Sequence, residues 1–79
     1  MKNLITLHEA IALALLANEN RTATFDEIAD FIIKRDLFPN RKAGIDLADQ
    51  VMLRSTKSKG QYAYLFEQIS LDTIKLRNT

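Results

Sequence analysis

The segment Thr24-Phe25-Asp26-Glu27-Ile28-Ala29-Asp30-Phe31-Ile32-Ile33-Lys34 decides the fold, because it carries a complete set of helix signals. Its first four residues have the form of a capping box. In such a box the Thr24 hydroxyl accepts a hydrogen bond from the Glu27 amide, and the Glu27 carboxylate accepts one from the Thr24 amide. Apolar residues then recur at helical spacing, at Phe25, Ile28, Ala29 and Ile32. The segment predicts an amphipathic helix that begins after Thr24 and ends before Pro39.

A second capping box, Thr6-Leu7-His8-Glu9, predicts an earlier helix that runs to about Ala17. The main apolar stripe of this helix consists of Leu7, Ala10, Ile11, Ala14 and Leu15. Leu13 and Leu16 lie off that stripe. This helix therefore carries more apolar surface than one face of a small core can use.

Helical spacing returns after the central segment, from about Ala43 to Ser55. The apolar positions there are Ile45, Ala48, Val51 and Met52. The polar run Ser55–Gly60 follows, and we expect it to end this third helix.

The pattern changes to a period of two from Tyr62 onward. One face of the expected strand carries Tyr62, Tyr64, Phe66 and Gln68, and the other carries Ala63, Leu65, Glu67 and Ile69. A turn at Ser70-Leu71-Asp72 and a second alternating run, Thr73–Arg77, complete a predicted β-hairpin. Residues 21–24, between the first two helices, could add a short third strand.

These elements predict a single α+β domain over residues 1–79, with three helices and a C-terminal hairpin, in the order found in a winged helix. The composition fits an ordered chain, because 47% of the residues are hydrophobic and 27% are charged. There is no cysteine, which excludes disulfides and cysteine-ligated zinc. His8 is the sole histidine, so the sequence predicts no metal site and no cofactor.

Several short motifs resemble those of the HARE-type helix-turn-helix domains. They are Leu7-x-x-Ala10-x-x-x-x-Leu15, Thr24-Phe25-x-Glu27-Ile28-Ala29, Asp36-Leu37-Phe38 and Phe66-x-x-Ile69-x-x-x-Thr73-Ile74-x-Leu76. The family occurs in the delta subunit of bacterial RNA polymerase, in restriction enzymes and in chromatin factors. The resemblance implies a winged helix with a transcription-related role, in DNA binding or in protein interaction. One departure is Asp72, because the family usually has glycine just before the last strand.

The longest apolar run, residues 10–17, is eight residues, whereas a membrane helix needs about 20. The first residues do not have the pattern of a signal peptide. We therefore expect a cytoplasmic protein with no membrane partner.

Charge distribution favours contact with double-stranded DNA near the third helix. The formal net charge is +1, yet residues 41–59 hold five cations and two acids, a net +3. A winged helix presents this helix to the major groove and its hairpin to the backbone or the minor groove. The candidate DNA-binding residues are Arg41, Lys42, Gln50, Arg54, Lys57, Lys59 and Lys75. Gln50 and Arg54 are the side chains suited to base edges, whereas Asp46 and Asp49 weaken the first turns as a phosphate contact.

The alternative is a protein-interaction or homodimerisation module that does not bind DNA directly. The candidate interface residues are Leu13, Leu16, Tyr62, Tyr64 and Phe66, because a two-layer domain buries only one sheet face. The tyrosines could instead stack on unpaired bases. Neither a nucleophile motif nor a phosphate-binding glycine loop is present, so we expect no enzyme activity and no small-molecule substrate.

Overall fold

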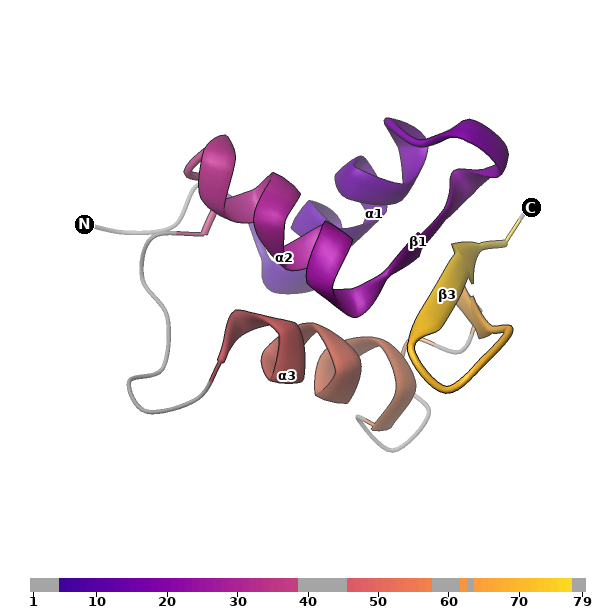
Figure 1. The fold of residues 1–79 in the computed structure, drawn as a ribbon. Helices are drawn as coiled ribbons and strands as arrows, with labels where there is room; N and C mark the ends of the chain where they lie inside the picture. The colour runs from indigo at the N-terminus through magenta and orange to yellow at the C-terminus, as the bar shows by residue number, and fades with distance from the viewer. Residues whose placement is uncertain (1–4, 39–45, 58–61, 63, 78–79) are drawn as a thin grey trace.

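The computed structural model describes residues 5–38, 46–57, 62 and 64–77. Within them the chain forms three α-helices and a three-stranded antiparallel sheet, so it is a small α+β fold (Figure 1). The elements in chain order are α1 (Leu7–Leu16), the 3-10 turn η1 (Glu19–Arg21), β1 (Thr22–Thr24), α2 (Phe25–Lys34), α3 (Leu47–Met52), the π-helical turn η2 (Leu53–Lys57), β2 (Phe66–Gln68) and β3 (Thr73–Leu76).

Both predicted capping boxes are present, and they begin α1 and α2. The Thr24 hydroxyl accepts from the Glu27 amide at 3.1 Å, and Glu27 Oε1 accepts from the Thr24 amide at 2.9 Å. The equivalent distances at Thr6 and Glu9 are 3.4 and 2.9 Å. These bonds satisfy backbone amides that the first helical turn leaves without intrahelical partners, which fixes where each helix starts.

The C-terminus of α2 is closed by a left-handed residue. Asp36 has φ 51°, and its amide donates to the Ile33 carbonyl at 3.1 Å. The Leu37 amide donates to the Ile32 carbonyl, also at 3.1 Å. This pair of bonds is a Schellman motif, which turns the chain away from the helix axis before Pro39.

The sheet has the strand order β1-β3-β2, with both pairs antiparallel. The third strand suggested by residues 21–24 is therefore confirmed as β1. Ala23 lies opposite Ile74, and Phe66 lies opposite Leu76; these four side chains are buried. Lys75 lies between Thr22 and Glu67 and is exposed, so one sheet face packs on the core and the other faces solvent.

The core lies between the three helices and the inner face of the sheet. Helix α2 contacts both α1 and α3, and the sheet lies at the end of the fold where α2 begins (Figure 1). The buried apolar residues are Leu7, Ala10, Ile11, Ala14, Leu15, Ala23, Phe25, Ile28, Ala29, Ile32, Leu47, Val51, Tyr62, Phe66, Ile74 and Leu76. They include the whole predicted stripe of each of the first two helices.

The first strand of the hairpin is shorter than the alternating pattern predicts. The Tyr62 carbonyl accepts from the amides of Leu65 and Phe66, at 2.9 and 3.1 Å. These bonds form a turn, so β2 begins only at Phe66. Tyr62 and Phe66 consequently both enter the core, with exposed fractions of 9% and 3%, and Tyr64 between them is 63% exposed.

The end of the third helix also differs from the prediction, whose start near Ala43 lies outside the described residues. The chain does not break at Ser55 but continues as the π-helical turn η2 to Lys57. The Ser55 hydroxyl donates to the Val51 carbonyl at 2.7 Å, and the Thr56 hydroxyl donates to the Met52 carbonyl at 2.6 Å. Serine and threonine hydroxyls often mark the end of a helix. In η2 the Ser55 and Thr56 hydroxyls instead donate to the Val51 and Met52 carbonyls, so the helical path continues as a wider turn.

Candidate functional site

The predicted DNA-contacting residues of the third helix lie on and around its solvent face. Leu47, Val51 and Ser55 recur every four residues and are buried, which turns the opposite side outward. Arg54 and Lys57 are exposed, and Gln50 is half-buried. Arg41, Lys42 and Lys59 lie outside the described residues.

Charge is polarised along α3 and η2. Asp46 and Asp49 are exposed at the start, and Arg54 and Lys57 at the end. This arrangement complements the helix dipole, which favours acids at the N-terminus and cations at the C-terminus. Within the described residues of α3 and η2, the cations are therefore confined to the last turns.

The hairpin lies beside this cationic end, because β2 contacts η2. Lys75 is on the exposed face of the sheet, next to Glu67 on the neighbouring strand. Arg77 Nη1 lies 3.9 Å from Glu67 Oε1. The turn that joins the two strands contains Leu71, which is 93% exposed, and the exposed Asp72 carboxylate, so it carries no cation.

Of the five predicted interface residues, three are exposed and two are buried. Leu13 and Leu16 are 44% and 55% exposed, and Tyr64 is exposed as well. Tyr62 and Phe66 are core residues, because the turn at Tyr62 directs both side chains inward. They therefore do not belong to an apolar surface. The remaining large exposed apolar residues of the described chain are Ile33, Leu53, Ile69 and Leu71.

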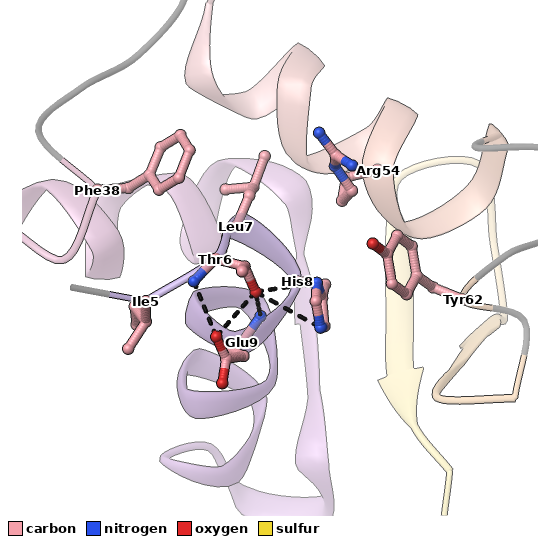
Figure 2. Close-up of a pocket in the computed structure, with 8 residues that line it drawn as sticks. All are labelled: Ile5, Thr6, Leu7, His8, Glu9, Phe38, Arg54 and Tyr62. Atoms are coloured by element: carbon pink, nitrogen blue, oxygen red, sulfur yellow. Dashed lines mark hydrogen bonds between the residues drawn. The ribbon is translucent and has the colours of Figure 1, made fainter. Parts of the chain in front are cut away.

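A pocket of about 450 Å³ adjoins Arg54 at the start of η2, between the start of α1 and Tyr62 (Figure 2). Its lining residues are Ile5, Thr6, Leu7, His8, Glu9, Phe38, Arg54 and Tyr62. The alternating pattern predicts that Tyr62 lies in a strand. His8 is the sole histidine, and the sequence gives it no partner for a site. The pocket was therefore not predicted, since only the fold brings its four segments together.

Tyr62 organises one wall of the pocket. The half-buried His8 ring stacks on the Tyr62 ring, with centroids 4.4 Å apart and planes inclined by 21°. The Arg54 guanidinium carbon lies 6.0 Å from the Tyr62 centroid, at the outer limit of a cation–π contact. Tyr62 thus holds two basic side chains from distant elements at one site.

The other polar residues of the pocket belong to the α1 capping box. Glu9 Oε1 accepts from both the amide and the hydroxyl of Thr6, each at 2.9 Å. Two hydrogen bonds lower the pKa of Glu9 below its usual value. The bond from the Thr6 backbone amide has the larger effect, and the bond from the Thr6 hydroxyl has the smaller one. Thr6 Oγ1 also lies 2.9 Å from His8 Nδ1, so the hydroxyl links the cap to the stacked ring.

Comparison with models of known families, with curated proteins and with solved structures finds no significant match. Among the described residues, no helix has the length and apolar character needed to cross a membrane. No group of three or more histidine and acidic side chains in this part of the chain is placed to hold a metal ion.

Proposed function

We propose that the chain is a non-enzymatic winged-helix module that binds double-stranded DNA in a transcription-related role. The observation that carries the proposal is the topology: a sheet of order β1-β3-β2, with α3 leading through η2 into the β2–β3 hairpin. A winged helix presents these two elements to DNA. The motifs that resemble the HARE-type domains support the same fold.

The charged residues support a contact through the end of α3 and not through its start. Arg54 and Lys57 are exposed beside the hairpin, whereas Asp46 and Asp49 at the other end repel phosphates. Gln50 and Arg54 carry the donors and acceptors that suit base edges. Lys75 adds a cation on the exposed face of the hairpin.

The test is a titration of labelled duplex DNA at two salt concentrations with the pair of substitutions Arg54→Ala and Lys57→Ala. Loss of the Lys57 phosphate contact is expected to reduce the slope of log K against log salt by about 0.9, and loss of Arg54 is expected to weaken binding further through its base contact. The matched control is Lys34→Ala with Arg35→Ala, which removes two cations from the end of α2. Equal effects of the two pairs, or no binding at low salt, would overturn the proposal.

A second candidate function is protein interaction through α1, including self-association. It is favoured by Leu13 and Leu16, two large apolar side chains that are about half exposed one turn apart on the same helix. Sedimentation of the protein with and without Leu13→Gln plus Leu16→Gln tests self-association. A dimer that the substitutions dissociate supports it, and a monomer at submillimolar concentration removes it.

A further inference from the structure

The pocket beside η2 has two walls of different chemistry. Figure 2 shows Arg54, His8 and the Tyr62 hydroxyl on one side, and Phe38 and Ile5 on the other. Leu7 lies between the two sides. A volume of about 450 Å³ falls within the range of about 300–1,000 Å³ that is typical of ligand pockets.

The basic side of the pocket retains a positive charge. Among the described residues, the ion pairs join Lys34 to Asp30 and Arg77 to Glu67, and no carboxylate lies within ion-pair distance of Arg54. Glu9 also lines the pocket, and its carboxylate, which accepts two bonds from Thr6, keeps a negative charge there. The Arg54 guanidinium is the cation of the pocket with which a ligand carboxylate can pair.

We propose that this pocket binds a peptide segment of a partner protein in which an aromatic residue is adjacent to an acidic one. The aromatic side chain packs against Phe38 and Leu7, and the carboxylate pairs with Arg54, whose planar fork matches its two oxygens. The Tyr62 hydroxyl, which points into the pocket, is a second donor. This site is separate from the proposed DNA contact except at Arg54.

The chemistry of the lining favours a carboxylate over a phosphate. A single guanidinium balances one negative charge, and Glu9 in the same pocket repels a doubly charged group more strongly than a singly charged one. The apolar wall also fits an amino-acid side chain better than a sugar–phosphate backbone. These two features distinguish a peptide from a nucleic acid at this site.

The test is an NMR titration of the full ¹⁵N-labelled chain with the blocked peptide acetyl-Ala-Phe-Asp-Ala-amide. Saturable shifts are expected at the amides of Thr6 and His8 and at the side-chain Nε–H of Arg54. The peptide with asparagine in place of aspartate should bind at least about tenfold more weakly, because a charge-assisted bond is lost. Equal affinity of the two peptides, or shifts confined to another surface, would overturn the proposal.

Tyr62→Phe tests this site apart from the DNA contact, whereas Arg54→Ala removes a residue that both proposals use. Tyr62→Phe keeps the ring that stacks on His8 and removes the hydroxyl. It should therefore weaken binding of the peptide several-fold. Arg54→Ala should weaken binding of the peptide by about tenfold or more, whereas Lys34→Ala, which is not among the lining residues, should leave it unchanged. Because no DNA is present, peptide binding can succeed or fail independently of the proposed function. Tighter saturation of the same amides by single-stranded oligothymidylate would contradict a peptide site.

Discussion

Asp36 illustrates how one residue can be essential to a helix end and yet suboptimal for it. Its φ of 51° is required by the Schellman motif that closes α2. A residue with a Cβ atom is disfavoured in this left-handed conformation by about 1–2 kcal/mol, and glycine is not. The sequence signal at this position was therefore weak, because the usual glycine is missing.

We predict that Asp36→Gly raises the free energy of unfolding by about 1 kcal/mol, since it relieves this conformational cost. Urea denaturation followed by circular dichroism measures the change. Asp36→Ala is the matched control, because it removes the carboxylate but keeps the Cβ atom. A similar gain in both variants would show that charge, and not backbone conformation, is the cause.

Glu9 makes the start of α1 sensitive to acid. Its pKa is lowered because the carboxylate accepts bonds from the Thr6 amide first and the Thr6 hydroxyl second. A carboxyl group whose pKa is lower in the folded state stabilises the fold above the unfolded pKa. That contribution is lost as the pH falls through the folded pKa.

We predict that Thr6→Ala raises the pKa of Glu9 only part of the way to its usual value, because the larger contribution comes from the Thr6 backbone amide. A ¹³C NMR titration of the Glu9 carboxyl group measures this directly. Thr6→Ser retains the hydroxyl and should keep the pKa low. Complete recovery of the usual pKa in Thr6→Ala would show that the side chain dominates instead.

Local signals were predictable from the sequence, and contacts between distant segments were not. Each capping box joins residues three apart, so four letters define it. The pocket joins His8, Arg54 and Tyr62, which lie in three separate parts of the chain. No spacing rule relates such residues before the fold is known.

Among the elements, helix α1 was predicted more accurately than the hairpin. Its apolar stripe repeats from Leu7 to Leu15, more than two helical turns. The alternation near Tyr62 is short and fits a turn as well as a strand. The Tyr62 carbonyl accepts from the Leu65 and Phe66 amides, and this shortens β2. As a result, Tyr62 and Phe66, which the alternating pattern predicts on a surface, lie in the core.

The two faces of α1 should respond very differently to the same substitution. Leu15 is fully buried, and its neighbour Leu16 is 55% exposed. We predict that Leu15→Ala lowers the free energy of unfolding by about 2–5 kcal/mol, and that Leu16→Ala changes it by less than about 0.5 kcal/mol. Chemical denaturation at low protein concentration gives both values. A large loss for Leu16→Ala under those conditions would mean that its side chain is not on a free surface.

At the scale of the whole molecule, the surfaces with different chemistry are carried by different elements. The exposed cations Arg54 and Lys57 lie beside the hairpin, and the apolar pair Leu13 and Leu16 lies on α1. The order of the elements and the hairpin were predictable, whereas the sequence did not predict the strand order β1-β3-β2. The binding partner was less predictable. Because the net charge is only +1, the distribution of charge along the chain is the main indication of what the protein binds.

The most direct test of the winged-helix proposal is NMR shift mapping of the ¹⁵N-labelled chain with duplex DNA at low salt. Binding through the end of α3 and the hairpin predicts shifts concentrated in residues 50–57 and 66–77, fading as salt increases. The amide signals on the exposed side of α1, near Leu13 and Leu16, should keep their chemical shifts. An unchanged spectrum, or shifts confined to α1, would contradict DNA binding through α3 and the hairpin.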